Sequence, residues 1–364
     1  MILENSKKAS LVLADGTVFE GKSLGAEGKV IGEVVFTTSM VGYQETLTDP
    51  AYCGQIIVQT FPLIGNYGVN SADDAAAYNA AAGYVVRECC EDPSNFRCEG
   101  KLEDYLVKNG TVGLCDIDTR SLTRVIREKG VMNGAIVCGD FDKEALLKEI
   151  NAFDAGCVTA KVSVKEKQSF AAENGKYNVA VLDLGMKNEL KDQLLKRGCN
   201  VTVMPCGATA EQVLAESPDG VIISGGPGDP AADTAAIETV KALIEKKLPI
   251  YAVCKGHQVL AVANGAKITK LKYGHRGASQ PVKSLENGKT YITAQNTGYA
   301  VEFDTMPAGA AELTHINGND KVCEGIRYLN IPAFSTQFSP DTSGSPHDTG
   351  YLYDRFIKMM EENK

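Results

Sequence analysis

The sequence predicts an α/β protein built from two domains, and three observations support this expectation. The chain has 364 residues, whereas single hydrophobic cores stop growing at roughly 250–300 residues. Residues 178–364 alternate between short apolar runs and helical patterns, which indicates a mostly parallel sheet covered by helices. Residues 1–150 contain strand-like and helical runs without this regular alternation, and we expect them to form a mixed α+β domain.

The N-terminal domain is expected to begin with a β-hairpin. The apolar run Ser10–Ala14 leads into Asp15-Gly16, and a second run starts at Val18. Asp-Gly accommodates the positive φ of a tight turn. Residues 119–129 place apolar side chains at helical spacing and stop at Gly130, which predicts a helix. Three further strands are predicted at Gly32–Phe36, Gln55–Thr60 and Tyr84–Val86.

Residues 151–177 differ in composition from the segments on either side. They are rich in Ala, Lys, Ser, Gly and Glu and carry only weak hydrophobic patterning, which is typical of a linker. We therefore expect an N-terminal domain over residues 1–150, a linker over 151–177 and a C-terminal domain over 178–364.

The C-terminal domain is expected to alternate strand and helix from its first residues. Its strands are predicted from β-branched and apolar runs, and its helices from apolar residues at helical spacing. Ligand sites in such sheets lie beyond the carboxyl ends of the strands. The predicted strands are Asn178–Leu184, Asn200–Met204, Gly220–Ile223 and Pro249–Val253, and the predicted helices are Lys187–Arg197, Thr234–Lys247 and Gly256–Ala263.

The composition argues against several classes of function. The formal net charge is −9, and because an acidic surface repels phosphate backbones, we expect no nucleic-acid partner. No run approaches the roughly 18 apolar residues that a membrane span needs, and the first residues carry no apolar signal core. We therefore expect a cytoplasmic protein without a membrane partner. No His, Cys or carboxylate cluster has metal-ligand spacing, so no metal site is predicted.

Cys254 stands where a predicted strand runs directly into a predicted helix. Gly256 follows two residues later, as in the sharp turns that hold a nucleophile in a strained, exposed position above a sheet. A helix N-terminus favours a thiolate over a thiol, and its free N–H groups can hold an oxyanion. The alternative is a buried cysteine that closes a strand.

The glycine-rich segment Ser224–Pro230 follows the preceding predicted strand. Its glycines let the backbone approach a ligand closely and donate N–H groups. A Gly-x-Gly pattern alone is equally consistent with an ordinary loop. Its significance comes from its position, one strand–helix unit before Cys254.

These segments and several others resemble one family over nearly the whole chain. In the C-terminal half, Gly225–Pro230, Cys254–Gln258 and Ala294–Tyr299 are similar to the motifs of class I glutamine amidotransferases. The N-terminal half resembles, more narrowly, the small subunit of carbamoyl phosphate synthetases. The segments that carry this second resemblance are Thr38–Glu45, Leu47–Pro50, Ile64–Asn66, Asp118–Thr123 and Ile126–Gly130.

The resemblance implies a glutamine amidotransferase fold in the C-terminal domain and a nucleophilic role for Cys254. Its thiolate would attack the side-chain amide of L-glutamine. The ammonia would travel through a tunnel to a large synthetase subunit, which combines it with bicarbonate and ATP to form carbamoyl phosphate. ATP and Mg²⁺ would therefore belong to the large subunit, and no cofactor is expected in this chain. The implied glutamine contacts are Ser39, Gly226, Gly228, Lys255, Gln258, Asn296, Gly298 and Tyr299.

The sequence departs from the family pattern at the catalytic triad. The family has Gln-Gly-His-Pro-Glu near the C-terminus, and Gln337 and Pro340 fix the register here. Ser339 then occupies the position of the histidine, and Asp341 that of the glutamate. A shorter carboxylate can still orient a base, but a hydroxyl is not a general base near neutral pH. We therefore expect impaired glutamine hydrolysis.

The chain has only four histidines that could replace the missing base. We expect His257 to be structural at the start of a helix, His275 to belong to a loop outside the triad, and His315 to lie on a surface strand. His347, eight residues after Ser339, is the strongest remaining candidate.

Two further departures from the family pattern lie close to the site in sequence. Lys255 replaces a residue that is usually apolar, and Thr297 stands where a histidine is common. The Lys255 ammonium would either favour the thiolate form of Cys254 or point to solvent.

Three functional hypotheses remain open on the sequence. The chain hydrolyses glutamine through an altered triad, or it is a structural or regulatory subunit of a synthetase that uses free ammonia. Alternatively, it has been recruited to another cysteine chemistry or another partner. Because all three share one fold, the fold cannot decide among them.

Overall fold

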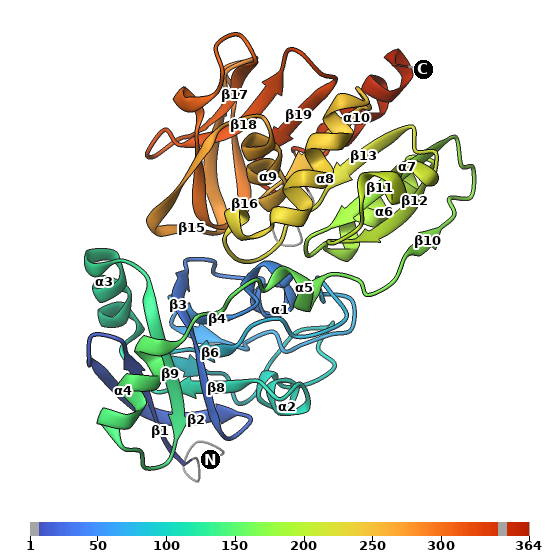
Figure 1. The fold of residues 1–364 in the computed structure, drawn as a ribbon. Helices are drawn as coiled ribbons and strands as arrows, with labels where there is room; N and C mark the ends of the chain where they lie inside the picture. Colours follow the sequence, from blue (N-terminus) through green and yellow to red (C-terminus); the bar gives the residue numbers. More distant parts are fainter. Residues whose placement is uncertain (1–6, 341–347, 364) are drawn as a thin grey trace. The chain divides into compact units, whose positions relative to one another are not determined.

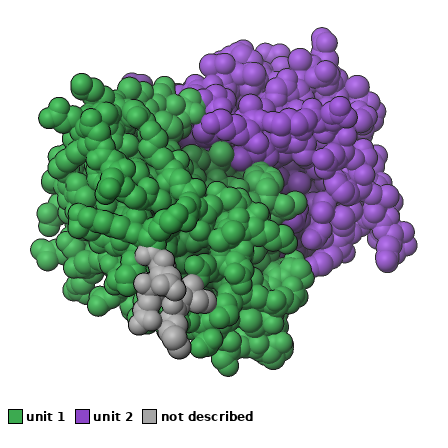
Figure 2. Space-filling model, turned by 90° about the horizontal axis from the view of Figure 1, so that it is seen from below, with its two compact units in different colours: residues 1–156 green, residues 157–364 purple. Residues whose placement is uncertain are grey.

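The computed structural model describes residues 7–340 and 348–363. The chain divides into two units, residues 1–156 and 157–364, coloured separately in Figure 2. The segment over which we expected a linker contains regular structure. The helix α4 (Lys143–Ala152) ends within it, and the helix α5 (Thr159–Val162) and the strand β10 (Gln168–Phe170) follow in the second unit.

The first unit is built around a closed seven-stranded barrel in the order β1-β2-β8-β6-β4-β3-β9 (Figure 1). The predicted hairpin is present, with β1 and β2 antiparallel and Gly16 of its turn at φ +84°. The barrel strands are β1 (Lys8–Leu13), β2 (Val18–Gly25), β3 (Lys29–Thr37), β4 (Gln55–Gln59), β6 (Gly83–Val85), β8 (Val112–Cys115) and β9 (Met132–Cys138).

Short helices and a small two-stranded sheet complete the first unit. The helix predicted over residues 119–129 is present as α3 (Thr119–Lys129), which buries Leu122 and Ile126 in the core. Its N-cap Asp118 accepts a hydrogen bond from the Ser121 N–H, which satisfies one of the free donors at a helix start. The other elements are α1 (Tyr43–Thr48), the 3₁₀ turn Pro50–Tyr52, α2 (Leu102–Lys108), β5 (Leu63–Ile64) and β7 (Glu88–Cys89).

The second unit contains a ten-stranded sheet in the order β10-β12-β11-β13-β14-β19-β18-β17-β15-β16. Its centre is parallel, because β12, β11, β13, β14 and β19 all run in one direction. The remaining strands extend the sheet antiparallel at both edges. The strands not yet given are β11 (Tyr177–Asp183), β12 (Cys199–Pro205), β13 (Gly220–Ile223), β14 (Ile250–Val253), β15 (Lys267–Ser284), β16 (Thr290–Glu302), β17 (Ala311–Asn317), β18 (Cys323–Tyr328) and β19 (Ala333–Thr336).

Helices pack on both faces of this sheet, as the sequence predicts for an α/β protein. One buried cluster joins the sheet to α7, α8 and α9, and the other joins it to α6 and α10 (Figure 1). The fold class is thus confirmed. The helices are α6 (Asn188–Lys196), α7 (Ala210–Ala215), α8 (Thr234–Glu245), α9 (Lys255–Ala263) and α10 (Tyr351–Glu362), with 3₁₀ turns at Pro230–Ala232 and Phe303–Thr305.

Within the described residues, no helix is long and apolar enough to cross a membrane. No group of three or more His, Cys, Asp and Glu side chains in that same part of the chain is arranged to hold a metal ion.

Candidate functional site

The turn predicted at Cys254 is present between β14 and α9. Cys254 has φ 53° and ψ −114°, a conformation that costs free energy in a residue with a Cβ. Its N–H donates to the Thr336 carbonyl at 2.8 Å, so the turn is tied to β19. A Cβ at Gly256 would lie 2.2 Å from the Ile223 carbonyl oxygen. Glycine is therefore required there for α9 to start so close to β13.

The Cys254 sulfur is half-buried and lies against two polar groups. Its Sγ is 3.7 Å from the Asn296 carbonyl oxygen on β16 and 3.8 Å from Nε2 of Gln337, which follows β19. The glycine-rich segment Ser224–Pro230, here called the glycine loop, also borders the sulfur, since a Cβ at Gly225 would lie 3.3 Å from the Cys254 Cβ. The site thus forms beyond the carboxyl ends of β13, β14 and β19, the expected place in a parallel sheet.

The Gln337 side chain is held in a fixed orientation by Gln258 of α9. The Gln258 Nε2 group donates to Oε1 of Gln337 at 2.8 Å, to Oγ1 of Thr297 at 3.0 Å and to the carbonyl of Tyr299 at 2.9 Å. Because Oε1 of Gln337 accepts from Gln258, its Nε2 end is directed at the sulfur. Gln258 therefore acts on the thiol through a second side chain.

Asn296, Gly298 and Tyr299, three predicted glutamine contacts, lie on β16. The Nδ2 group of Asn296 is buried and has no hydrogen-bond partner in the described part of the chain. Leaving a buried donor without a partner costs free energy, so this group is suited to a ligand. Ser39 belongs to the first unit, where its carbonyl accepts from Nε2 of Gln59 at 2.8 Å. Its contact with glutamine remains a prediction.

The glycine loop between β13 and α8 has features of a backbone donor site. A Cβ at Gly226 would lie 2.0 Å from the Leu184 carbonyl oxygen, so only glycine fits there. Gly228 has φ +82°, which glycine adopts without strain. Among the described residues, the N–H groups of Gly226 and Gly228 donate to no acceptor.

Lys255 does not point to solvent, which was one of the two alternatives for its side chain. Its side chain is only 3% exposed and forms an ion pair with Asp233, whose side chain is 5% exposed. The ammonium also donates to Oγ1 of Thr159 at 2.7 Å and to the Pro227 carbonyl. The expectation that it points to solvent is wrong, because these partners together satisfy a buried cation. Asp233 lies beside the Lys255 ammonium and offsets its charge. That Lys255 favours the thiolate form of Cys254 stays a prediction.

Ser339, the position of the missing histidine, follows β19 and forms an isolated bridge with Ala294 of β16, the strand that also carries the contact of Cys254. Its N–H donates to the Ala294 carbonyl at 3.3 Å, and the Cys254 sulfur lies at the Asn296 carbonyl. Carbonyl groups two residues apart on a strand point the same way and are separated by roughly 7 Å. Ser339 and Cys254 therefore contact β16 at carbonyl groups two residues apart. Asp341 lies outside the described residues.

The three histidines within the described residues are engaged by partners of their own. His257 is fully buried on α9, with Nδ1 2.8 Å from the Ser335 hydroxyl, and burial lowers its pKa to about 3. His275 pairs with Asp320 at 2.7 Å. His257 is thus structural, as expected, and His347 lies outside the described residues.

The expected exposure of His315 is wrong. It is 1% exposed, and its ring packs edge-on against Phe338 with centroids 5.5 Å apart. The strand β17 lies inside the sheet between β18 and β15, so the side chain is covered. Burial lowers the pKa of His315 to about 4.

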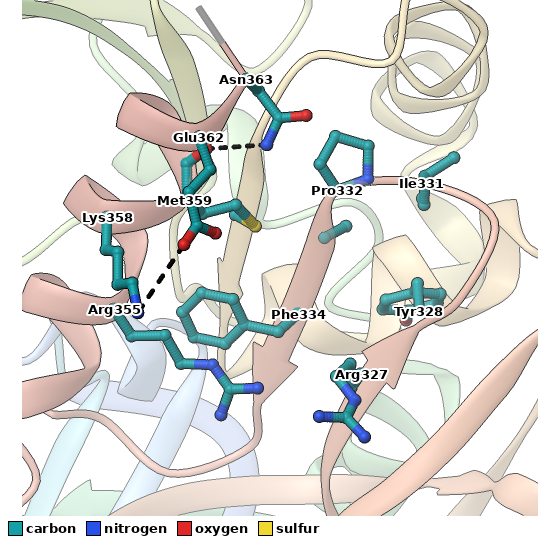
Figure 3. Close-up of a pocket in the computed structure, with 11 residues that line it drawn as sticks. Arg327, Tyr328, Ile331, Pro332, Phe334, Arg355, Lys358, Met359, Glu362 and Asn363 are labelled. Carbon is teal, nitrogen blue, oxygen red and sulfur yellow. Dashed lines mark hydrogen bonds and ion pairs between the residues drawn. The ribbon is translucent and has the colours of Figure 1, made fainter.

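A separate cavity of about 510 Å³ lies between α10 and the start of β19 (Figure 3). It is at the opposite end of β19 from Gln337, and its cations are already paired. Arg355 contacts Glu286 at 2.9 Å, Arg327 contacts Glu312, and Lys358 contacts Glu362 at 3.6 Å. This cavity is not part of the site around Cys254.

Sequence reasoning missed the roles of three side chains at the site. Gln337 served only to fix the register, although an amide two residues before the triad position is a signal for a polar contact. Asp233 was visible only as an acidic residue before a helix. Thr159 lay in the expected linker and carried no signal.

Comparison with known proteins agrees with this geometry. Residues 11–136 match the carbamoyl-phosphate synthase small chain, CPSase domain, and residues 180–359 match the class I glutamine amidotransferases. The carbamoyl phosphate synthase small chain of Syntrophotalea carbinolica is 44% identical over 98% of this chain and 99% of its own length. That of Fusobacterium nucleatum is 45% identical over 97% of this chain and 98% of its own. The chain therefore belongs to the family of carbamoyl phosphate synthase small chains, with a glutamine amidotransferase domain in its second unit.

Proposed function

We propose that this chain binds L-glutamine at Cys254 as the small subunit of a carbamoyl phosphate synthase, and that its own glutamine hydrolysis is impaired. The large subunit would receive the ammonia and combine it with bicarbonate and ATP. The observation that carries the proposal is that the chain keeps a strained, half-buried thiol at the start of α9 but has Ser339 at the position of the base.

Several contacts support retention of a glutamine site. The Cys254 thiol lies at the N-terminus of α9, where the helix dipole favours a thiolate, and Gln337 directs an N–H group at the sulfur. The N–H groups of Gly226 and Gly228, which donate to no acceptor among the described residues, can bind the oxygen that becomes negative during attack. The buried Nδ2 of Asn296 can donate to a polar group of the same ligand.

The reaction that these groups support has two stages. The Cys254 thiolate adds to the side-chain carbonyl carbon of glutamine, a C–S bond forms, and the carbonyl electron pair moves to oxygen. When that pair returns, the C–N bond breaks, and the nitrogen must gain a proton to leave as ammonia. Water then hydrolyses the thioester to glutamate.

The proton transfers are where this chain is deficient. A positioned acid–base group typically contributes about 10²–10⁴-fold to a rate, and the hydroxyl of Ser339 can neither take the thiol proton near neutral pH nor donate to the leaving nitrogen effectively. The described histidines have other partners. Attack therefore remains possible, while turnover is slow.

The test is restoration of the base. With the large subunit present, we expect slow release of glutamate from glutamine, and carbamoyl phosphate formation that is faster with ammonium chloride as nitrogen source. Ser339→His, combined with Asp341→Glu, should raise glutamate release by about 10²-fold, and Cys254→Ala should abolish that gain. Rapid glutamate release by the unmodified chain, lost in Cys254→Ala, would show that hydrolysis is intact.

Binding to a synthetase large subunit distinguishes the proposed function from recruitment of this chain to a different partner. If the purified chain binds no synthetase large subunit, recruitment to a different partner is favoured over the proposed function.

A further inference from the structure

The Lys255 side chain joins the turn at Cys254 to three other segments of the second unit. Lys255 is the first residue of α9, directly after Cys254. Its ammonium reaches Thr159 on α5, the Pro227 carbonyl in the glycine loop, and Asp233 at the start of α8. The turn at Cys254, α5, the glycine loop and the start of α8 are thus held together by contacts with one buried cation.

The contact with Pro227 fixes the orientation of one peptide group. In a trans peptide the C=O and the following N–H point in opposite directions. Because the ammonium holds the Pro227 carbonyl, the Gly228 N–H must point away from Lys255. This N–H donates to no acceptor among the described residues. Gly228 is also the exposed part of the loop and tolerates either peptide orientation readily, since it has φ +82° and no Cβ.

Asp233 makes this arrangement possible. It is the N-cap residue of α8 and is 6% exposed, so its carboxylate is stabilised by the positive end of that helix. A buried ammonium needs such a partner, because an unpaired buried charge costs far more than the ion pair gains. The pair therefore keeps a cation in contact with the glycine loop, beside a carboxylate that offsets its charge.

The geometry points to Lys255 as a positioning residue for glutamine, whose ammonium locks the Pro227–Gly228 peptide so that the Gly228 N–H stays available to the bound side-chain amide. This role belongs to the side chain of Lys255 and not to its backbone. The inference rests on the proposed function, in which glutamine binds at Cys254. An unlocked peptide could rotate and present a carbonyl oxygen in place of the N–H, which would repel the developing oxyanion.

The test compares two reagents that modify Cys254, with each adduct measured by peptide mass spectrometry. Iodoacetamide reports on the thiolate and needs no glycine loop. A chloroketone analogue of glutamine also needs the loop and the pocket. The first variant is Lys255→Met, which keeps the length of the side chain. It leaves the buried carboxylate of Asp233 without its cation and could fold poorly for that reason. The double variant Lys255→Met with Asp233→Asn removes this unpaired carboxylate as well. The control is Lys241→Met, which removes an exposed ion pair with Glu238 on α8.

We expect the double variant to react with the chloroketone at least about tenfold more slowly than the parent. Its rate of reaction with iodoacetamide should stay within about twofold of the parent's. The pH midpoint of the iodoacetamide reaction should not shift. The control should match the parent with both reagents. Equal chloroketone rates in parent and variant would overturn the inference, as would a parallel loss with both reagents, which indicates a general effect on the thiol or the fold.

The proposed function fails by a different outcome. If the unmodified chain reacts with iodoacetamide but its reaction with the chloroketone is not slowed by added glutamine, the glutamine site itself is absent, and the inference falls with it.

Discussion

The Nε2 group of Gln337 lies 3.8 Å from the Cys254 sulfur, and Gln258 fixes this orientation from the opposite end of the amide. An N–H directed at sulfur stabilises the thiolate. We expect Gln337→Leu, which keeps similar volume, to slow alkylation of Cys254 by iodoacetamide at pH 7 several-fold. Gln168→Leu, at an exposed position on β10, is the control. Unchanged alkylation in Gln337→Leu would mean that the amide only fills space.

The backbone at Cys254 predicts a difference between two substitutions that both remove the thiol. With φ 53° and ψ −114°, the residue is strained, and glycine lacks the Cβ that causes the strain. Cys254→Gly should therefore be more stable to unfolding than Cys254→Ala by about 1–2 kcal/mol. Urea denaturation of both variants measures this difference, and equal stabilities would place the turn outside the strained region.

Gly256 predicts a packing defect at the start of α9. A methyl group there meets the Ile223 carbonyl oxygen at 2.2 Å and that of Ser224 at 2.9 Å. Gly256→Ala should lower the free energy of unfolding by about 1–3 kcal/mol, in the range of other overpacked sites. Gly207→Ala, where the added Cβ meets no atom within 4 Å, is the matched control and should change little. A neutral Gly256→Ala would contradict the close approach of α9 to β13.

Glu45 of α1 predicts a pH dependence in the first unit. Burial raises the pKa of Glu45 from 4.5 to about 7. Between these two pH values, the folded state holds a proton that the unfolded state has lost. Its contribution to stability is therefore full below about pH 4.5 and is lost as the pH rises through about 7. Glu45→Gln should flatten this decline.

Amide hydrogen exchange of residues 43–48, which form α1, measures the stability of the first unit separately from that of the second. It is measured in urea at pH 5 and at pH 8. Glu128→Gln, at an exposed position on α3, should keep the pH dependence of the parent. A decline of the same size in Glu45→Gln would assign the effect to another group.

The parts of the fold that the sequence predicts best are those with strong local patterns. The elements β13, β14, α3 and α9 follow from apolar runs and glycine stops, and they occur within one or two residues of the expected positions. The antiparallel half of the sheet was not predicted. The strand β15 mixes exposed lysines and tyrosine with glycines, so its hydrophobic alternation is weak, and its pairing with β16 and β17 depends on residues far along the chain.

The site shows the same division between local and long-range information. The turn at Cys254 is a local property of a strand, a cysteine and a glycine, so the sequence reveals it. The burial of Lys255 depends on Asp233, which is 22 positions earlier, and on Thr159, and no periodicity links them. His315 was expected on a surface strand, whereas the strands on both sides of β17 bury it.

Dissolved salt should act unequally on the charge pairs of this protein. Mobile ions screen exposed charges over a Debye length of about 8 Å at physiological ionic strength, and screen buried pairs much less. The side chains of Lys29 on β3 and Glu149 on α4 are 46% and 49% exposed, whereas those of Lys255 and Asp233 are 3% and 5% exposed. Concentrated salt should thus weaken the surface ion pairs of the first unit and leave the Lys255–Asp233 pair beside the glycine loop in place.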